Sequence, residues 1–350
     1  MHDNSAKGLS GSPYGIHRVL DQEKTFPQSA NRLDNDTSKL FDNEIRVSVH
    51  ELCLDSASFR QIKESQANDP VRIASEIERT VANRGKMHNP VTGSGGVLMG
   101  VIDAIGRGLQ TRISAKVGDR VVTLASLALT PLNLLGIRNV NLANGHISVR
   151  GSAIIFETAP FANIPDAMNE DLVLSVLDVC GAPMQTARLV KKGDLVFIMG
   201  SGKSGMLCAY ASREDLSKSC KIVMLVYSAE EAAIARSLDI VDEIIIGDAT
   251  NPIQVKDEFD RVTEGRQADL TLNCVNTQFS EMASILCTKT GGTIYFFNMN
   301  TNFSRAALGA EGISKDVTMM IGNGYSAGHA DYALQLVRDN PKLQTFFGPL

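Results

Sequence analysis

The chain has 350 residues, 43% of them hydrophobic and 21% charged, a composition typical of a soluble globular protein rather than a disordered one. Its net charge of −5 comes from 34 basic and 39 acidic residues, with no block of Lys or Arg, which argues against nucleic-acid binding. The length exceeds the usual size of a single core, so we expect two domains.

The start of the chain and its cysteines bear on location. The opening "MHDNSAKGLSGSPYGIHRVL" does not show a charged start followed by an apolar core, so we expect no signal peptide. No apolar run reaches the roughly 18 residues of a membrane span. Six cysteines without a CxxC pair indicate reduced thiols rather than a disulfide framework. We therefore predict a cytoplasmic protein with no membrane partner and no nucleic-acid partner.

The first half of the chain is predicted to be rich in strands. Residues 1–40 are polar and irregular and are expected to run over the surface. Between about 44 and 160, alternating runs such as "EIRVSVHEL", "GVLMGVIDAIG" and "GHISVRGSAIIF" predict the strands of a small barrel or sandwich. One helix interrupts them in "DPVRIASEIERTVANRG", where Ile73, Ile77 and Val81 share a face.

From about residue 165 the pattern changes to helices alternating with buried strands. The runs "DLVFIMG", "KIVMLVYS", "EIIIGD", "ADLTLNCV" and "GTIYFFNM" are apolar on both faces, as strands between two layers of helices must be. Helices are expected between them, including 204–217, 229–238 and 277–288. This alternation predicts an α/β fold with a doubly wound parallel sheet and right-handed crossovers.

A glycine-rich loop lies between the first of these strands and the next helix. It matches GxGxxG in the strand–turn–helix context that a dinucleotide fingerprint requires. Gly200 permits the tight turn, Gly202 lets the backbone approach a pyrophosphate, and Gly205 lets the helix pack on the strand. The helix N-terminus favours phosphate as well. The predicted cofactor-binding residues of the loop are Gly200, Ser201, Gly202, Lys203, Ser204 and Gly205.

This loop has two other interpretations. A nucleoside-triphosphate loop needs a glycine where Phe197 stands, so that interpretation fails despite the "GKS". Glycine-rich packing without a ligand is the remaining alternative.

The choice between NAD and NADP stays open. An acidic side chain at the end of the second strand would bind the ribose 2′-hydroxyl. Tyr227 and Ser228 occupy the expected positions, Glu230 and Glu231 come slightly later, and no arginine follows at once to hold a 2′-phosphate. The remaining predicted cofactor-binding residues are Tyr227, Ser228 and Asn298.

Three segments together resemble the medium-chain dehydrogenase/reductase superfamily: "VGDRVV" (117–122), "KKGDLVFIMGSGKSG" and "KTGGTIYFF". The resemblance implies a GroES-like catalytic domain at 1–165 and a Rossmann nucleotide-binding domain at 166–319, with 320–350 returning to the first domain. It implies substrate in the cleft between the domains. It further implies a nicotinamide-dependent oxidoreductase that forms a homodimer or homotetramer.

The zinc ligands of metal-containing members have no counterpart here. Their first ligand, a cysteine, falls on Asp55 or its neighbours, with Cys53 two residues early, and their "GHE" falls on residues 95–97 (Gly-Gly-Val). A tetrahedral zinc site is therefore short of ligands, and we predict no zinc. Coordination of another ion by His50 and His88 is the alternative.

A reaction that needs no metal is hydride loss from a carbon that carries an amine. The nitrogen lone pair expels the hydride and leaves an iminium, which water hydrolyses. The segments "GSPYGIHRVL" and "FPQSANRLDN" resemble the family of L-erythro-3,5-diaminohexanoate dehydrogenases of bacterial lysine fermentation. The resemblance implies a diamino acid substrate, NAD or NADP as cofactor, and 5-amino-3-oxohexanoate and ammonium as products.

The superfamily resemblance also suggests which residues meet the substrate. Glu51, Asp55 and Ser56 lie where a barrel strand ends and faces the nicotinamide. We predict that Asp55 binds the reacting ammonium and accepts its proton, with Glu51 as the second candidate. For each carboxylate, pairing with solvent or a local arginine is the alternative interpretation.

The substrate carboxylate and the loops around it give further candidates. Arg60 and Arg84 are predicted to bind the carboxylate, His88 to relay protons from a loop at the cleft, and Tyr325 to close its far side. Ordinary surface arginines are the alternative for the first two. Two other functions stay open for the chain: a zinc-free quinone or enoyl reductase, and a dinucleotide-binding protein without catalysis.

Overall fold

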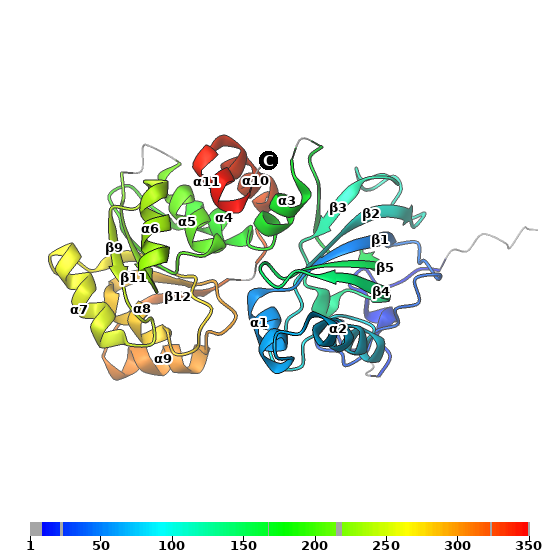
Figure 1. Cartoon of the computed structure of the whole chain (residues 1–350), viewed down its shortest axis with the longest axis horizontal. Helices are drawn as coiled ribbons and strands as arrows, with labels where there is room; N and C mark the ends of the chain where they lie inside the picture. Colours follow the sequence, from blue (N-terminus) through cyan, green and yellow to red (C-terminus); the bar gives the residue numbers. More distant parts are fainter. Residues whose placement is uncertain (1–8, 22–23, 167, 215–218, 323, 349–350) are drawn as a thin grey trace, which may run out of the picture. The chain divides into compact units, whose positions relative to one another are not determined.

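The computed structural model describes residues 9–21, 24–166, 168–214, 219–322 and 324–348. They fall into two compact units, Met1–Glu170 and Asp171–Leu350. The first unit is built on a six-stranded antiparallel sheet with the order β4-β5-β1-β2-β3-β6 (Figure 1). Its strands are β1 (Glu44–Cys53), β2 (Val97–Ile105), β3 (Arg120–Thr123), β4 (Leu132–Val140), β5 (His146–Phe156) and β6 (Phe161–Asn163).

Two helices accompany this sheet, α1 (Ser56–Ser65) and α2 (Pro70–Arg84), together with 3-10 turns at Ile16–Arg18 and Leu127–Leu129. Helix α2 packs beside the edge strand β4. Helix α1 was not predicted from the sequence. Its residues are mostly polar, and only Ser58, Phe59 and Ile62 are buried, which is too few for a clear helical period.

Helix α2 is the element that its own sequence specifies most completely. The Asp69 side chain caps it by accepting two backbone N–H bonds, Pro70 occupies its first turn, and Gly85 ends it in the left-handed conformation, with φ of 66°. The side chains predicted to share one face are confirmed as part of the core of this unit: Ile73, Ile77 and Val81.

Residues 1–8 and 22–23 of the segment before β1 lie outside the described residues. The rest of this segment is irregular, as predicted, but the expectation that it only runs over the surface is wrong. Arg18 is fully buried. Its Nε lies 2.8 Å from Oε1 of Glu44 in β1, and its Nη2 lies 2.7 Å from Oε2. The same guanidinium donates to the backbone carbonyls of Asp36 and Lys39. A buried ion pair therefore anchors this segment to the central strand.

Glu44 is held in its charged form by these neighbours. Burial alone would raise the pKa of its carboxyl, but hydrogen bonds from Arg18, His17 and the backbone of Phe41 outweigh burial and hold that pKa at about 2. The carboxylate is thus ionised at every pH at which the protein is expected to work.

Lys86 makes a second buried attachment of the same segment. Its side chain is fully buried, and Nζ donates to the carbonyls of Pro27 at 2.6 Å and Gln28 at 3.2 Å. Burial, with a smaller contribution from the charge of Arg84, lowers the pKa of Lys86 to about 8. The folded state therefore releases this proton more readily than the unfolded chain does.

The Lys86 pKa predicts a pH-dependent stability. Between about pH 8 and 10.5 the unfolded chain binds the proton while the folded chain has lost it, so this group makes the protein more stable as pH rises. We expect the free energy of unfolding of the wild type, relative to that of Lys86→Met, to increase by about 3 kcal/mol across this window. Urea unfolding at several pH values, followed by circular dichroism, measures the difference.

Lys63→Met is the matched control, because Lys63 is only partly buried and its Nζ donates to one carbonyl, that of Leu142. We expect its stability relative to the wild type to stay level across the same window. A level difference for Lys86→Met as well would show that Lys86 does not titrate there.

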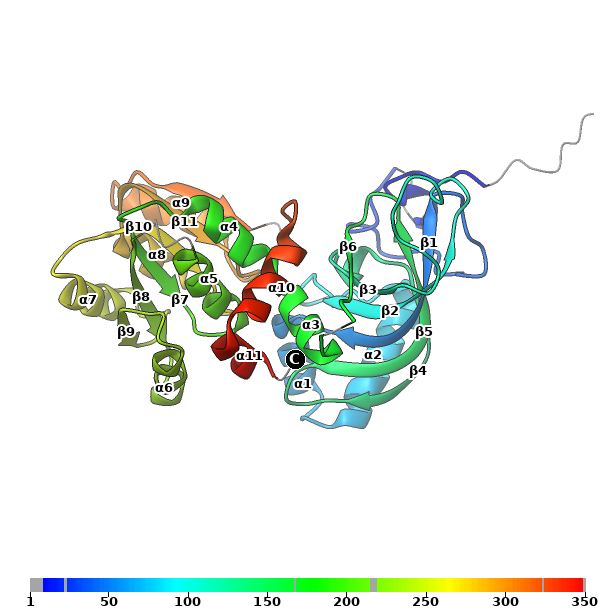
Figure 2. The same ribbon diagram turned by 90° about the horizontal axis from the view of Figure 1, so that it is seen from above.

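The second unit is a doubly wound parallel sheet, as predicted (Figure 2). Its strands are β7 (Leu195–Met199), β8 (Lys221–Val226), β9 (Glu243–Ile246), β10 (Ala268–Asn273), β11 (Thr288–Phe296) and β12 (Thr318–Ile321). The helices are α3 (Glu170–Leu177), which spans the division between the units, α4 (Gly181–Leu189), α5 (Lys203–Arg213), α6 (Ala229–Leu238), α7 (Pro252–Thr263), α8 (Glu281–Cys287), α9 (Phe303–Gly312), α10 (His329–Asp339) and α11 (Pro341–Phe347).

The three predicted helices of this unit correspond to α5, α6 and α8, although α5 and α8 are shorter than expected. Part of the expected extent of α5, residues 215–218, lies outside the described residues. The C-terminal helix α10 packs against α4 and α5 within the second unit, and α11 packs against α10.

The strand order β12-β11-β10-β7-β8-β9 creates a switch point beside β7. The chain enters the sheet at β7, adds β8 and β9 on one side, and then adds β10, β11 and β12 on the other. Helices α4, α5 and α10 pack together, as do α7, α8 and α9 (Figure 1). In such sheets ligands bind at the carboxyl ends of the strands where the order reverses, here the ends of β7 and β10. None of the described helices is both long enough and apolar enough to span a membrane.

Candidate active site

The glycine-rich loop follows β7 at this switch point. Gly200 adopts φ of +99° and donates its N–H to the carbonyl of Leu225 in β8 at 2.8 Å. A Cβ on Gly205 would lie 1.9 Å from the Gly200 oxygen, so the helix can pack this close only with glycine there. A Cβ on Gly202 would meet nothing within 4 Å. Gly200 and Gly205 are therefore required by the backbone conformation and packing of the loop, whereas Gly202 leaves open space beside it.

Helix α5 begins directly at this space. Gly202 is its N-cap, and no side chain caps it. The first-turn N–H groups, beginning at Lys203 and Ser204, are therefore not capped by a side chain. A helix N-terminus of this kind favours a phosphate group both by hydrogen bonding and by its dipole. The loop has the geometry that a dinucleotide pyrophosphate requires.

This geometry predicts the outcome of Gly202→Ala. The backbone at Gly202 has φ of −71°, which alanine adopts readily, and the added methyl has no neighbour within 4 Å. We expect thermal stability within about 0.5 kcal/mol of the wild type, and NADH binding weakened by about tenfold or more, because the methyl fills the space for the pyrophosphate. Fluorescence titration with NADH, beside a thermal melt, measures both.

Gly265→Ala serves as the control, since Gly265 also has open space around it but ends α7 rather than contacting the loop. Because Gly265 has a φ of +79°, Gly265→Ala is expected to be less stable than the wild type. Its dissociation constant for NADH is expected to stay at the wild-type value. Undiminished NADH binding by Gly202→Ala would place the pyrophosphate elsewhere.

At the end of β8, next to the loop, Tyr227 is 72% exposed and Ser228 caps α6. The carboxylate of Glu231, in the first turn of α6, accepts hydrogen bonds from the Ser201 hydroxyl at 2.7 Å and from the Tyr227 N–H at 3.0 Å. Sequence spacing placed Glu231 too late for a ribose-binding residue. The structure brings its carboxylate back to the strand end, because a helix turn reverses the direction of the chain.

Asn298 follows β11 and is held within its own loop. Its Nδ2 donates to Oδ1 of the buried Asn273 at 2.9 Å. Its Oδ1 accepts from the N–H of Asn300 and the hydroxyl of Thr301. The side chain therefore shapes the loop at the carboxyl end of β11, on the same edge of the sheet as the glycine-rich loop.

In the first unit, Asp55 lies between β1 and α1. Its Oδ1 caps α1 by accepting the Ser58 N–H at 3.0 Å, whereas its Oδ2 is buried and has no hydrogen-bond partner. A buried carboxylate oxygen without a partner is unusual and favours a bound donor group. Ser56 begins α1 and is exposed, and Glu51 is partly buried in β1, opposite Met99 of β2.

His88 lies in the loop between α2 and β2, which is fastened to the start of α1. Asn89 Nδ2 donates to Gln61 Oε1 at 2.9 Å, and the hydroxyls of Ser58 and Thr92 are 2.6 Å apart. His88 Nδ1 is also buried without a hydrogen-bond partner. Two buried polar atoms without partners, one on Asp55 and one on His88, thus belong to segments that contact each other.

The electrostatics distinguish these two groups. Burial, reinforced by the charges of Lys86 and Arg84, lowers the pKa of His88 to about 4. The imidazole is therefore neutral near pH 7 and too weak a base to hold a proton there. A neutral imidazole has no charge with which to attract the substrate ammonium, so Asp55 stays the first candidate to bind it.

The remaining predicted residues are less closely grouped. Arg84 ends α2, half-buried, and its charge acts on His88. Arg60 is exposed on α1 and directly follows the buried residues Ser58 and Phe59. Tyr325 belongs to the second unit, where its ring packs edge-on against His329 with centroids 5.1 Å apart.

The donor set does not fit a tetrahedral metal site. Within the described ranges, no three His, Cys, Asp or Glu side chains are grouped so as to hold a metal ion. His50, considered as a ligand above, lies 3.8 Å from Glu170 at the surface. None of the six cysteines forms a disulfide; five are buried, and Cys274 is half-buried.

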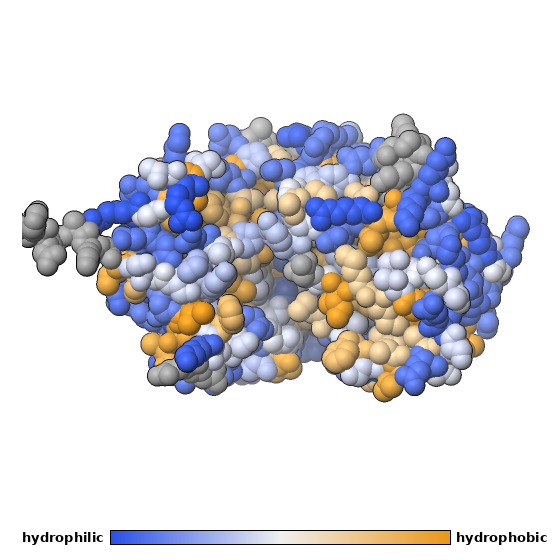
Figure 3. All heavy atoms as spheres, turned by 180° about the vertical axis from the view of Figure 1, so that it is seen from behind, coloured by the Kyte–Doolittle hydropathy of each residue, from blue (hydrophilic) through white to orange (hydrophobic). Residues whose placement is uncertain are grey.

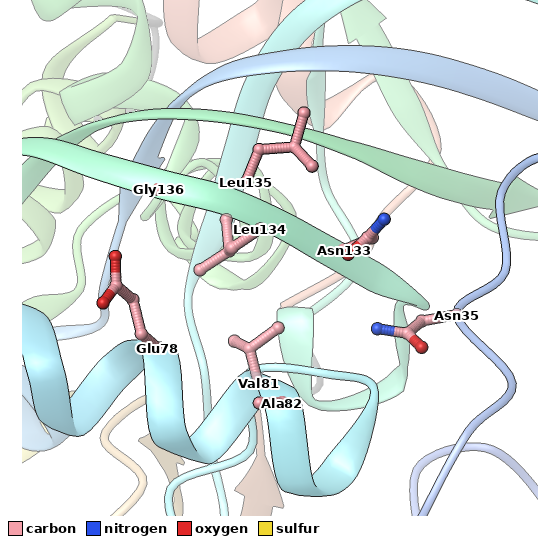
Figure 4. Close-up of a pocket in the computed structure, with 8 residues that line it drawn as sticks. All are labelled: Asn35, Glu78, Val81, Ala82, Asn133, Leu134, Leu135 and Gly136. Atoms are coloured by element: carbon pink, nitrogen blue, oxygen red, sulfur yellow. The ribbon is translucent and has the colours of Figure 1, made fainter.

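A cavity of about 320 Å³ opens in the first unit, away from the predicted site residues (Figure 4). It lies between α2 and β4, with Glu78 at one end, Asn35 and Asn133 at the other, and Val81 and Leu134 between them. None of the predicted catalytic residues lines it.

Comparison with curated proteins shows the family to which the chain belongs. A curated protein of Acetoanaerobium sticklandii named L-erythro-3,5-diaminohexanoate dehydrogenase is 45% identical over 340 residues, covering 97% of this chain and 98% of that protein. The chain belongs to the L-erythro-3,5-diaminohexanoate dehydrogenase family. A second member, from Fusobacterium nucleatum, is 42% identical over 97% of this chain and 99% of its own length.

The model of the L-erythro-3,5-diaminohexanoate dehydrogenase N-terminal domain matches residues 17–165. This range includes Asp55 and His88. The family prediction made from the sequence is confirmed, and with it an oxidoreductase activity class.

Solved structures confirm the predicted fold of this L-erythro-3,5-diaminohexanoate dehydrogenase family member. An alcohol dehydrogenase of Thermotoga maritima aligns with a TM-score of 0.53 at 13% identity, covering 87% of this chain and 84% of that one. A mycobacterial protein complexed with NADPH aligns with a TM-score of 0.53 at 15% identity, covering 95% and 86%. The antiparallel sheet of the first unit and the parallel sheet of the second agree with the predicted GroES-like and Rossmann folds.

Proposed function

We propose that the chain catalyses oxidative deamination of L-erythro-3,5-diaminohexanoate with NAD or NADP and water, giving 5-amino-3-oxohexanoate, ammonium and the reduced dinucleotide. The observation that carries the proposal is the identity of 42–45% over nearly the full length of two relatives that bear this enzyme's name.

The second unit supplies the dinucleotide site. The open space beside Gly202 and the start of α5, which no side chain caps, fit a pyrophosphate. A dinucleotide held there would supply the acceptor for the hydride that the substrate loses. Tyr227, Ser228 and Asn298 stand at the carboxyl ends of β8 and β11, on the edge where the rest of the dinucleotide is expected.

The first unit supplies the proton acceptor. An ammonium has no lone pair, so the reacting nitrogen must lose a proton before it can expel a hydride from its carbon. Asp55 Oδ2 is buried and unpaired, which suits it to bind the ammonium and take that proton. Water then adds to the iminium carbon, and ammonium leaves. Glu51 and Ser56 lie near the same strand end, and Arg84 and Arg60 are the candidates for the carboxylate.

Some members of the superfamily that the sequence resembles bind zinc. The residues of this chain at the corresponding positions, Asp55 and residues 95–97, do not fit a zinc ion. Asp55 Oδ1 is already used by the Ser58 N–H, and residues 95–97 carry no ligand side chain. We expect full activity after treatment with a chelator, since the nitrogen lone pair supplies the driving force that a metal supplies for an alcohol.

The test is an absorbance assay at the reduced-nicotinamide band, with 3,5-diaminohexanoate, ordinary amino acids, alcohols and enones each supplied in turn. Reduction of NAD or NADP that requires the diamino acid supports the proposal. Oxidation of NADPH or NADH by enones alone would instead make the chain a zinc-free enoyl or quinone reductase. Dinucleotide binding without turnover of any of these substrates would make it a non-catalytic binding protein.

We propose assembly as a homodimer or homotetramer. The edge strand β12 carries Ile321, 67% exposed, and α9 carries Phe303 and Leu308, 71% and 66% exposed. Apolar residues occupy much of the visible surface of the second unit in Figure 3. Surface of this kind is typical of an interface. Light scattering during size-exclusion chromatography measures the assembly.

A further inference from the structure

We infer that Glu231 selects NAD over NADP by binding the ribose of the adenosine half of the dinucleotide. The inference rests on the proposed function, since it assumes a dinucleotide on the glycine-rich loop. It assigns a specificity-determining role to a helix residue, because the strand-end position that usually carries the acid holds Tyr227 and Ser228.

The carboxylate of Glu231 joins the two segments that a dinucleotide would touch. Its Oε2 accepts from the hydroxyl of Ser201, which lies between Gly200 and Gly202, at 2.7 Å. The same oxygen accepts from the N–H of Tyr227, the first residue after β8, at 3.0 Å. The charge is therefore placed at the junction of the phosphate-binding turn and the end of the second strand.

The start of α6 fixes this position. Ser228 is the N-cap, and its hydroxyl accepts the Glu231 N–H at 3.2 Å. In the usual capping box the third-position glutamate bonds back to the N–H of the cap residue itself. Here the carboxylate reaches one residue further, to Tyr227, and this carries it to the loop. Helix capping and ligand recognition thus use the same side chain.

The chemistry distinguishes the two dinucleotides. The hydrogen bonds from Ser201 and Tyr227 both end on Oε2 of Glu231. Oε1 takes part in neither, so it can accept a hydrogen bond from a ribose hydroxyl. A free 2′-hydroxyl donates such a bond, and a charged acceptor makes it strong. A 2′-phosphate has no hydrogen to donate near neutral pH and brings negative charge beside the carboxylate, which repels it. NADP is disfavoured on both counts.

The experiment measures dissociation constants of NADH and NADPH by the change in fluorescence of the reduced nicotinamide on binding. The wild type, Glu231→Gln and the control Glu230→Gln are compared. Glu230 is the neighbouring carboxylate of the same helix turn and is exposed. We expect the wild type to bind NADH about tenfold or more tighter than NADPH.

In Glu231→Gln we expect this ratio to fall by about tenfold, chiefly because NADPH binds more tightly, whereas Glu230→Gln keeps the wild-type ratio. Glu231→Ala gives a second measurement of the same ratio, with a thermal melt on each variant, because the residue also supports the start of α6. Equal binding of both dinucleotides by the wild type, or an unchanged ratio in both Glu231 variants, overturns the inference and leaves the proposed function intact. Failure of the wild type to bind either dinucleotide would instead contradict the proposed function.

Discussion

Asp55→Asn is expected to lower kcat for diaminohexanoate oxidation by about 10²–10⁴-fold, while the dissociation constant of NADH stays at its wild-type value. Asparagine retains an oxygen that can accept the Ser58 N–H, so α1 keeps its cap. The second carboxylate oxygen is replaced by an amide group that cannot take a proton. Steady-state kinetics and a NADH titration on the same preparation measure both quantities.

The chain offers a matched control for this substitution. Asp69 caps α2 by accepting the N–H groups of Val71 and Arg72, and it is the same residue type in the same structural role. Asp69→Asn is expected to leave kcat unchanged. If Asp55→Asn also retained the wild-type kcat, Asp55 would have no part in proton transfer, and Glu51 would become the first candidate.

Arg18→Met is expected to destabilise the protein by about 3–5 kcal/mol, because it leaves the buried carboxylate of Glu44 without its main partner. The double variant Arg18→Met with Glu44→Leu is expected to recover much of this loss, since an apolar pair has no buried charge. Urea unfolding followed by circular dichroism measures the free energy of unfolding of each. A loss below about 1 kcal/mol in the single variant would mean that the pair behaves like an exposed ion pair.

The pH dependence of the wild type provides an independent check on the same pair. The pKa of Glu44 is lowered from 4.5 to about 2 on folding, so the stability that it contributes is complete above about pH 4.5 and is lost as pH falls toward 2. This contribution amounts to about 3 kcal/mol. The single variant should therefore show a weaker dependence on pH between 4.5 and 2 than the wild type does.

The features predicted well from the sequence are those that depend on neighbours along the chain. The apolar face of α2 follows from the spacing of Ile73, Ile77 and Val81, and the roles of Gly200 and Gly205 follow from the turn between a strand and a helix. The parallel sheet follows from strands that are apolar on both faces. In each case one or two turns of chain contain the relevant information.

The features that were missed depend on residues far apart in the sequence. Arg18 and Glu44 are 26 positions apart, and Ser201 and Glu231 are 30 apart. Counted along the sequence, Glu231 comes after the position expected for a ribose-binding acid. The count does not include the first turn of α6, which brings the Glu231 carboxylate back to the loop. The burial of Lys86 is set by Pro27 and Gln28, in a segment whose composition suggested only surface.

The two carboxylate oxygens of Asp55 have separate surroundings, and this limits how such an enzyme can be redirected to new substrates. Lengthening the side chain to glutamate would move the oxygen that we propose as the acceptor for the amine, and it would also remove a favoured cap from α1. Engineering for longer or shorter amines should therefore leave position 55 untouched and vary nearby exposed positions, such as Ser56 and Arg60, whose side chains can change without unwinding α1.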